Sequence, residues 1–136
     1  MLTKSKDVYH ANLCEKLLVL SLAKICNYVP GAGIWLNTQR PEWNDANNAL
    51  VGNGTSMVTV YYLKRFLEFF KKLTSQISID NIDISLEVLL WFNEVEKAMV
   101  TYKNINHGTI SDQDRMNYVS SFGKIFENYR KKIYSK

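Results

Sequence analysis

The segment TQRPEWNDANNALVGNG, residues 38–54, separates two apolar helical patterns and so decides how the chain divides into elements. A connection of this length inside a compact domain is uncommon, and those that occur are usually functional or disordered. Disordered segments are rich in charge and poor in large apolar groups. This segment contains Trp43 and Leu50, and it closely follows the apolar run Ile34-Trp35-Leu36. We therefore expect one long, ordered, site-forming loop after the first helix.

The composition indicates one globular unit. The chain has 136 residues, of which 46% are apolar and 22% are charged, as is typical of globular proteins. Much of the net charge of +4 comes from residues 130–136. A solvated helix end explains these cations better than a nucleic-acid footprint, which needs basic side chains clustered on one face. We expect a single helical unit over residues 1–136 that binds no nucleic acid.

The two cysteines, Cys14 and Cys26, indicate neither a disulfide nor a metal site. They are twelve positions apart on one predicted helix, which places them about 18 Å apart and beyond disulfide reach. There is no Cys-x-x-Cys pair that would suggest zinc, and no motif suggests a cofactor. No apolar run approaches the ~20 residues that cross a bilayer. We expect a cytoplasmic chain with reduced cysteines, no metal, no cofactor and no membrane contact.

Four helices are predicted, and no sheet. Apolar residues recur at helical spacing over about 7–27, 55–74, 85–103 and 111–133. Thr55 or Ser56 suits the cap of the second helix, and Ser111 suits the cap of the fourth. Residues 77–83 alternate between apolar and polar, which fits a short extended connector. The expected fold class is therefore all-α, with about four helices in antiparallel hairpins.

The apolar positions also predict which helix faces are buried. The first helix is apolar on most sides, so we expect several neighbours around it. The side of the third helix expected to face the core consists of Leu86, Leu89, Leu90, Phe92, Val95, Met99 and Tyr102.

The long loop contains the residue types that cleave glycosidic bonds. Such cleavage needs a carboxylic acid that protonates the leaving oxygen, together with a second carboxylate or an incoming phosphate. Glu42 and Asp45 are the candidate catalytic carboxylates. A structural alternative stays open, in which Asp45 caps a turn and Arg40 pairs with Glu42.

Candidate substrate-binding residues surround the two carboxylates. Tryptophan rings offer flat apolar faces for stacking on a sugar, a guanidinium binds a carboxylate, phosphate or hydroxyl group, and amides pair with sugar hydroxyls. The candidates are Trp35, Arg40, Trp43, Asn44 and Asn48.

The run RPEWNDANNALVG, residues 40–52, resembles the Asp-Trp-Asn-Asp-x-x-Asn loop of the cellobiose phosphorylase type of glycoside phosphorylases. Those enzymes are built on an (α/α)6 toroid, in which this loop joins two barrel helices and supplies the general acid. The run Trp43-Asn44-Asp45 matches the family's Trp-Asn-Asp, and Asn48 falls on the later Asn. Glu42 stands where the family has Asp. The resemblance implies that Asp45 donates the proton while Glu42 orients it, although the substitution leaves the choice between the two carboxylates open.

The resemblance also implies a larger assembly, because a full toroid has many more helices than the four predicted here. We expect the chain to be a fragment of a larger bacterial carbohydrate-active protein. Its partners would then be an oligosaccharide substrate, inorganic phosphate if the reaction is a phosphorolysis, and the remainder of a larger chain or a partner subunit.

Two functions remain open. The leading one is a segment of a glycoside phosphorylase or hydrolase that supplies a general-acid loop and is inactive when isolated. The alternative is a small non-enzymatic helical module that binds another protein. A contiguous exposed apolar patch of more than roughly a few hundred Å² would indicate a missing neighbour in either case.

Overall fold

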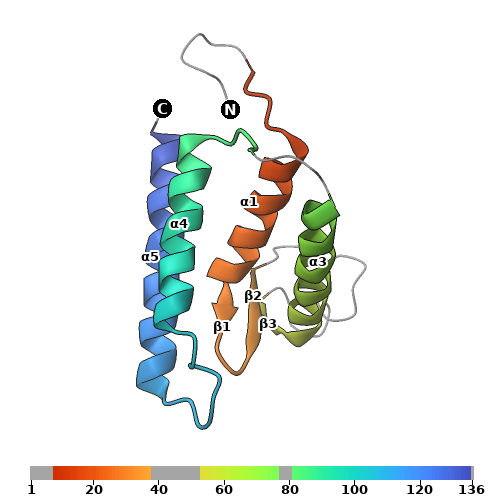
Figure 1. Ribbon diagram of the computed structural model, residues 1–136. Coiled ribbons are helices and arrows are strands. Elements are labelled where there is room, and N and C mark those ends of the chain that lie inside the picture. The colour runs from red at the N-terminus through yellow and green to blue at the C-terminus, as the bar shows by residue number, and fades with distance from the viewer. Residues whose placement is uncertain (1–7, 38–52, 77–80, 136) are drawn as a thin grey trace.

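The described part of the chain folds into four helices and one small sheet (Figure 1). The computed structural model describes residues 8–37, 53–76 and 81–135. In chain order the elements are α1 (Leu13–Cys26), β1 (Tyr28–Val29), β2 (Gly33–Asn37), β3 (Asn53–Ser56), α3 (Met57–Gln76), α4 (Leu86–Thr101) and α5 (Asp112–Tyr134). The four predicted helices are confirmed. Figure 1 shows α4 and α5 side by side as an antiparallel hairpin, while α1 and α3 run in opposite directions.

The expectation of an all-α chain is wrong, because three short strands form an antiparallel sheet in the order β1-β2-β3. The register pairs Ile34 with Ser56 and Asn37 with Asn53. Strand β3 reads Asn-Gly-Thr-Ser, and Asn and Gly are depleted in strands. Its extended state therefore depends on pairing with β2, a segment that is distant in the sequence.

Gly33 allows β2 to approach the start of α3. Its φ of +126° is a conformation that side chains rarely adopt, and a Cβ built there would lie 2.8 Å from the carbonyl carbon and oxygen of Ser56. Only glycine therefore fits this contact. The Ser56 hydroxyl accepts a hydrogen bond from the Thr59 backbone N–H (3.2 Å) and so caps α3, as predicted.

Polar side chains cap two other helices. The Ser111 hydroxyl accepts a hydrogen bond from the Asp114 N–H (3.1 Å), which confirms the predicted cap of α5. Helix α1 begins at Leu13 and not near residue 7, because Asn12 has extended backbone geometry and its side chain accepts from the Glu15 N–H (2.8 Å). An asparagine in this role ends the helix on its N-terminal side.

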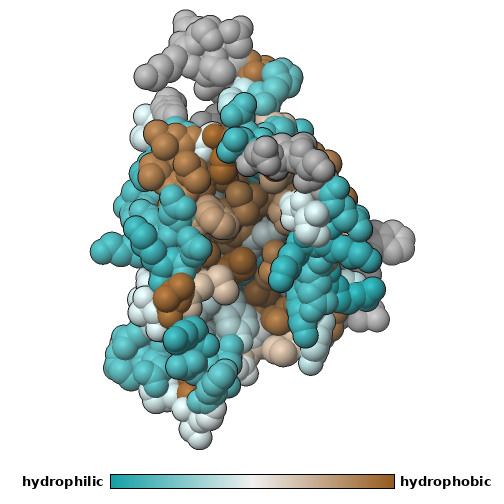
Figure 2. All heavy atoms as spheres, in the orientation of Figure 1, coloured by the Kyte–Doolittle hydropathy of each residue, from teal (hydrophilic) through white to brown (hydrophobic). Residues whose placement is uncertain are grey.

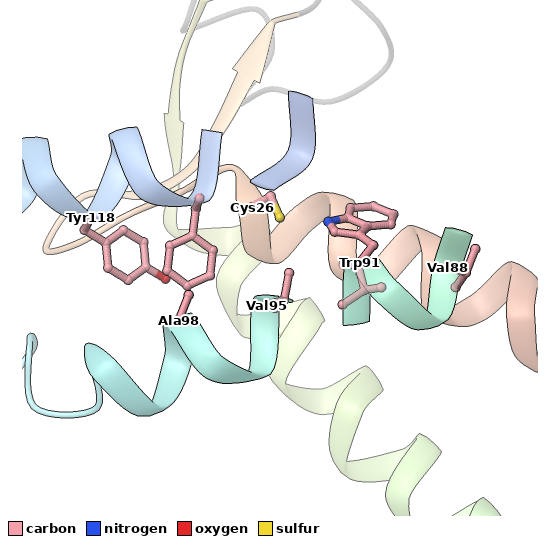
Figure 3. Close-up of a cluster of buried hydrophobic side chains, with 8 residues drawn as sticks. Cys26, Val88, Trp91, Val95, Ala98 and Tyr118 are labelled. Atoms are coloured by element: carbon pink, nitrogen blue, oxygen red, sulfur yellow. The ribbon is translucent and has the colours of Figure 1, made fainter. Parts of the chain in front are cut away.

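The core lies between α1, α4 and α5 (Figure 3). Trp91 is at its centre and stacks on Phe126 and Tyr129, with ring centroids 5.3 and 4.0 Å away. The buried members of the cluster are Leu22, Cys26, Val88, Trp91, Val95, Ala98, Tyr118 and Phe122.

The face that α4 buries differs from the predicted one. Its buried side chains are Val88, Trp91, Val95 and Ala98. Of the seven predicted core positions only Val95 is buried, and Tyr102 is half-buried. The other five are exposed: Leu86, Leu89, Leu90, Phe92 and Met99. Helix α4 is apolar on two sides, and the hairpin with α5 and the contact with α1 cover only one of them.

Helix α3 stands apart from this core. None of its 20 side chains is buried. Its principal contacts are with β2 and α1, and Figure 1 shows it on the opposite side of α1 from the α4–α5 hairpin. The apolar stripe of α3, which consists of Val60, Leu63 and Leu67, is therefore only partly covered.

Candidate functional site

Trp35 is the only predicted site residue that the structure describes. It lies on β2 opposite Thr55, its backbone N–H donates to the Asn27 carbonyl (2.7 Å), and its side chain is 46% exposed. The other predicted site residues lie outside the described part of the chain; they are Arg40, Glu42, Trp43, Asn44, Asp45 and Asn48. Their convergence with Trp35 stays a prediction, as does the ordered loop that contains them.

A cavity of about 620 Å³ lies beside Trp35, between the sheet and α5. This volume is within the range of small-molecule sites. The lining residues are Cys26, Asn27, Tyr28, Val29, Trp35, Asp112, Arg115, Met116, Val119 and Gly123. The Arg115 guanidinium in this lining already donates hydrogen bonds to the Asp112 carboxylate (2.6 Å) and to the Pro30 carbonyl (3.1 Å). We call this space the Trp35 cavity.

A second, more apolar hollow of about 310 Å³ opens between α3 and the rest of the fold. Residues of all four helices, β1 and β2 line it: Ile25, Tyr28, Ile34, Val60, Leu63, Lys64, Leu67, Glu68, Met99 and Tyr118. Figure 2 shows apolar side chains along this hollow, with hydrophilic side chains on both flanks. We call it the helix groove.

Exposed apolar side chains also border the helix groove on both sides, beside the hydrophilic ones. On the α4 side, Met99 is 50% exposed and Phe92, seven positions earlier on the same face, is also exposed. On the α3 side, Leu67 is 36% exposed. Exposed apolar side chains gathered around one hollow are the usual mark of an interaction surface.

The Cys26 thiol and the Tyr118 hydroxyl, which line the two hollows, are poor nucleophiles. Burial raises the pKa of the Cys26 thiol to about 11, although the Trp91 indole N–H, which points toward its sulfur in Figure 3, acts in the opposite direction. The indole N–H makes no full hydrogen bond. Burial likewise raises the pKa of the Tyr118 hydroxyl. Both groups stay protonated at neutral pH and act as core side chains.

A buried carboxylate that the sequence did not reveal joins α1 to the start of α4. Glu15 is 3% exposed. It accepts hydrogen bonds from the Tyr9 hydroxyl (2.8 Å), the Ser85 backbone N–H (3.3 Å) and the Ser85 hydroxyl. The bond to Glu15 raises the pKa of Tyr9. The fold itself supplies the hydrogen-bond donors to the Glu15 carboxylate, and the N-terminus of α4 favours a negative charge. We therefore assign Glu15 a structural role.

Within residues 8–37, 53–76 and 81–135, no group of three or more His, Cys, Asp or Glu residues is placed to hold a metal ion. Among the helices of these same ranges, none has the length and apolar character needed to cross a membrane. Neither a family model nor a curated protein matches the chain. The resemblance of residues 40–52 to a phosphorylase loop therefore stays a prediction.

Proposed function

We propose that this chain is a small helical module that binds an amphipathic helix of another polypeptide in the helix groove. The observation that carries the proposal is the apolar stripe of α3, which has no buried side chain and faces an open apolar hollow. Grooves of this kind take up a helix whose apolar side chains recur every three or four residues. A bound helix would cover the exposed 36% of Leu67 and 50% of Met99, and burial of this remaining apolar surface would stabilise a complex by about 1 kcal/mol each.

The exposed face of α4 supports the same function. A helix that presents apolar side chains on two sides needs a neighbour on each of them. Helix α5 and α1 supply the first neighbour, and an incoming helix between α3 and α4 would supply the second. Another segment of a larger helical assembly could equally cover this second apolar face of α4.

We expect Met99→Asp to weaken helix binding. A phage-displayed library of amphipathic helices panned against the wild-type chain should yield peptides that become helical when bound. Their affinity should fall at least about tenfold for Met99→Asp, because a carboxylate would then be buried against an apolar helix face.

The matched control is Val100→Asp, on the next residue of α4, which is 65% exposed and does not line the groove. This variant should bind the selected peptides as the wild type does. Equal losses in both variants, or a library that yields no helical binder, would contradict the proposal.

A carbohydrate-active role is a second candidate, and the exposed ring of Trp35 favours it. An accessible indole face beside a cavity with Asn27 and Arg115 is a suitable platform for a sugar ring. Under this proposal Asp45 donates the proton, with Glu42 as its partner, and Arg40, Trp43, Asn44 and Asn48 complete the substrate site.

Calorimetric titration with cellobiose, with and without inorganic phosphate, tests this candidate. Trp35→Ala should weaken cellobiose binding about fivefold or more, because the stacking face is lost. Tyr134→Ala, which removes another exposed ring, should have no effect. Asp45→Asn should retain cellobiose binding, because the carboxylate serves proton transfer and not stacking. Absence of binding, or equal binding by Trp35→Ala, would remove the candidate.

A further inference from the structure

We infer that the helix which occupies the groove is α3 of a second copy of this chain. This inference rests on the proposed helix-binding function and names its partner. Helix α3 is itself an amphipathic helix without a buried side chain, with apolar positions Val60, Leu63 and Leu67 along the groove. A two-fold arrangement places α3 of each copy in the groove of the other, so that one self-complementary contact covers both unburied stripes.

The charges of the two flanking helices complement each other. Helix α3 has four basic side chains and one acidic, whereas α4 has three acidic and one basic. Lys64 lines the groove beside Glu68, with which it forms an exposed ion pair (3.9 Å) that contributes little by itself, and Lys71 lies seven positions after Lys64 on the same side of α3. Opposite charges that face each other across an interface favour this partner over others.

Glu96 lies on the same face of α4 as Met99, the α4 residue that lines the groove, and we call this face the acidic edge of α4. It lies four positions after Phe92 and three before Met99, so the three side chains share one face of the helix. When α3 of the second copy enters the groove, its Lys64 and Lys71 lie along this edge. Each copy contributes both halves of the contact, so the pairing occurs twice.

A charge-swap experiment tests the pairing by sedimentation equilibrium. The wild type should form dimers, whereas Glu96→Lys alone and the double variant Lys64→Glu/Lys71→Glu should each dimerise at least about tenfold more weakly. An equimolar mixture of the two variants should recover the dimer, because both contacts in the mixed pair then join opposite charges. The double variant Lys124→Glu/Lys132→Glu, which changes the net charge equally on α5, should dimerise as the wild type does.

The result can separate this inference from the function on which it rests. A wild-type chain that is monomeric at about 1 mM, or variants whose mixture does not restore the dimer, would overturn the second-copy pairing. If such a monomer still binds selected helices in a Met99-dependent way, the helix-binding function stands and its partner is another protein. If Met99-dependent binding is also absent, both proposals are overturned.

Discussion

Replacing Trp91 with alanine is expected to lower the free energy of unfolding by about 3–5 kcal/mol, the largest effect of any single substitution proposed for this chain. Its ring is 2% exposed and packs parallel to two aromatic rings of α5, with interplanar angles of 13° and 17°. Removing it leaves a cavity where α1, α4 and α5 meet, and the loss combines buried apolar area with stacking. Urea unfolding followed by far-UV circular dichroism measures the change without relying on indole fluorescence.

Trp35→Ala is the matched control for this substitution. It removes the same side chain from a site that is nearly half exposed, so it should cost roughly half as much as Trp91→Ala. If Trp91→Ala does not fold, Trp91→Phe should fold with a smaller loss, since phenylalanine keeps one ring in the stack. Equal destabilisation by the two alanine variants would contradict the assigned core.

Glu15→Ala is expected to destabilise the fold by about 3 kcal/mol. The carboxylate satisfies the Ser85 N–H and hydroxyl at the start of α4 and the hydroxyl of Tyr9. Its removal leaves the part-buried Ser85 N–H and hydroxyl without their acceptor, which costs more than the loss of a surface hydrogen bond. Glu15→Gln keeps one acceptor oxygen and should lose about half as much. Chemical unfolding at neutral pH measures both changes.

A double-mutant cycle with Ser85→Ala identifies the source of this loss. If the hydrogen bonds to Ser85 cause the loss of stability, the free energy of unfolding of the combined variant should fall by clearly less than the sum of the two single losses. Glu127→Ala, which removes a surface carboxylate paired with Lys131 (2.7 Å), should leave stability nearly unchanged. Additive losses in the cycle would show that Glu15 acts through burial and not through Ser85.

The candidate site was predictable only in part. The sequence indicated that Trp35 belongs to a site-forming region. The structure places its exposed ring beside a cavity, and its role in a site stays a prediction. The helix groove was not predicted, although one signal for it was present: α4 has more apolar positions than a single buried face requires. Helical spacing cannot tell which of two apolar faces meets the core, because that depends on where α1 and α5 lie.

Local chemistry in the sequence determined the four helices of the described residues and the capping role of Ser111, and it narrowed the cap of α3 to Thr55 or Ser56. Helical periodicity and capping involve residues only three or four positions apart. Tertiary structure alone decided the sheet, the burial of Trp91 and the role of Glu15. Each of these depends on distant partners, as when β3 is held extended by β2, or when Ser85, seventy positions away, completes the hydrogen bonds of Glu15. Such contacts leave no periodic pattern in the chain, and so they appear only when the elements pack.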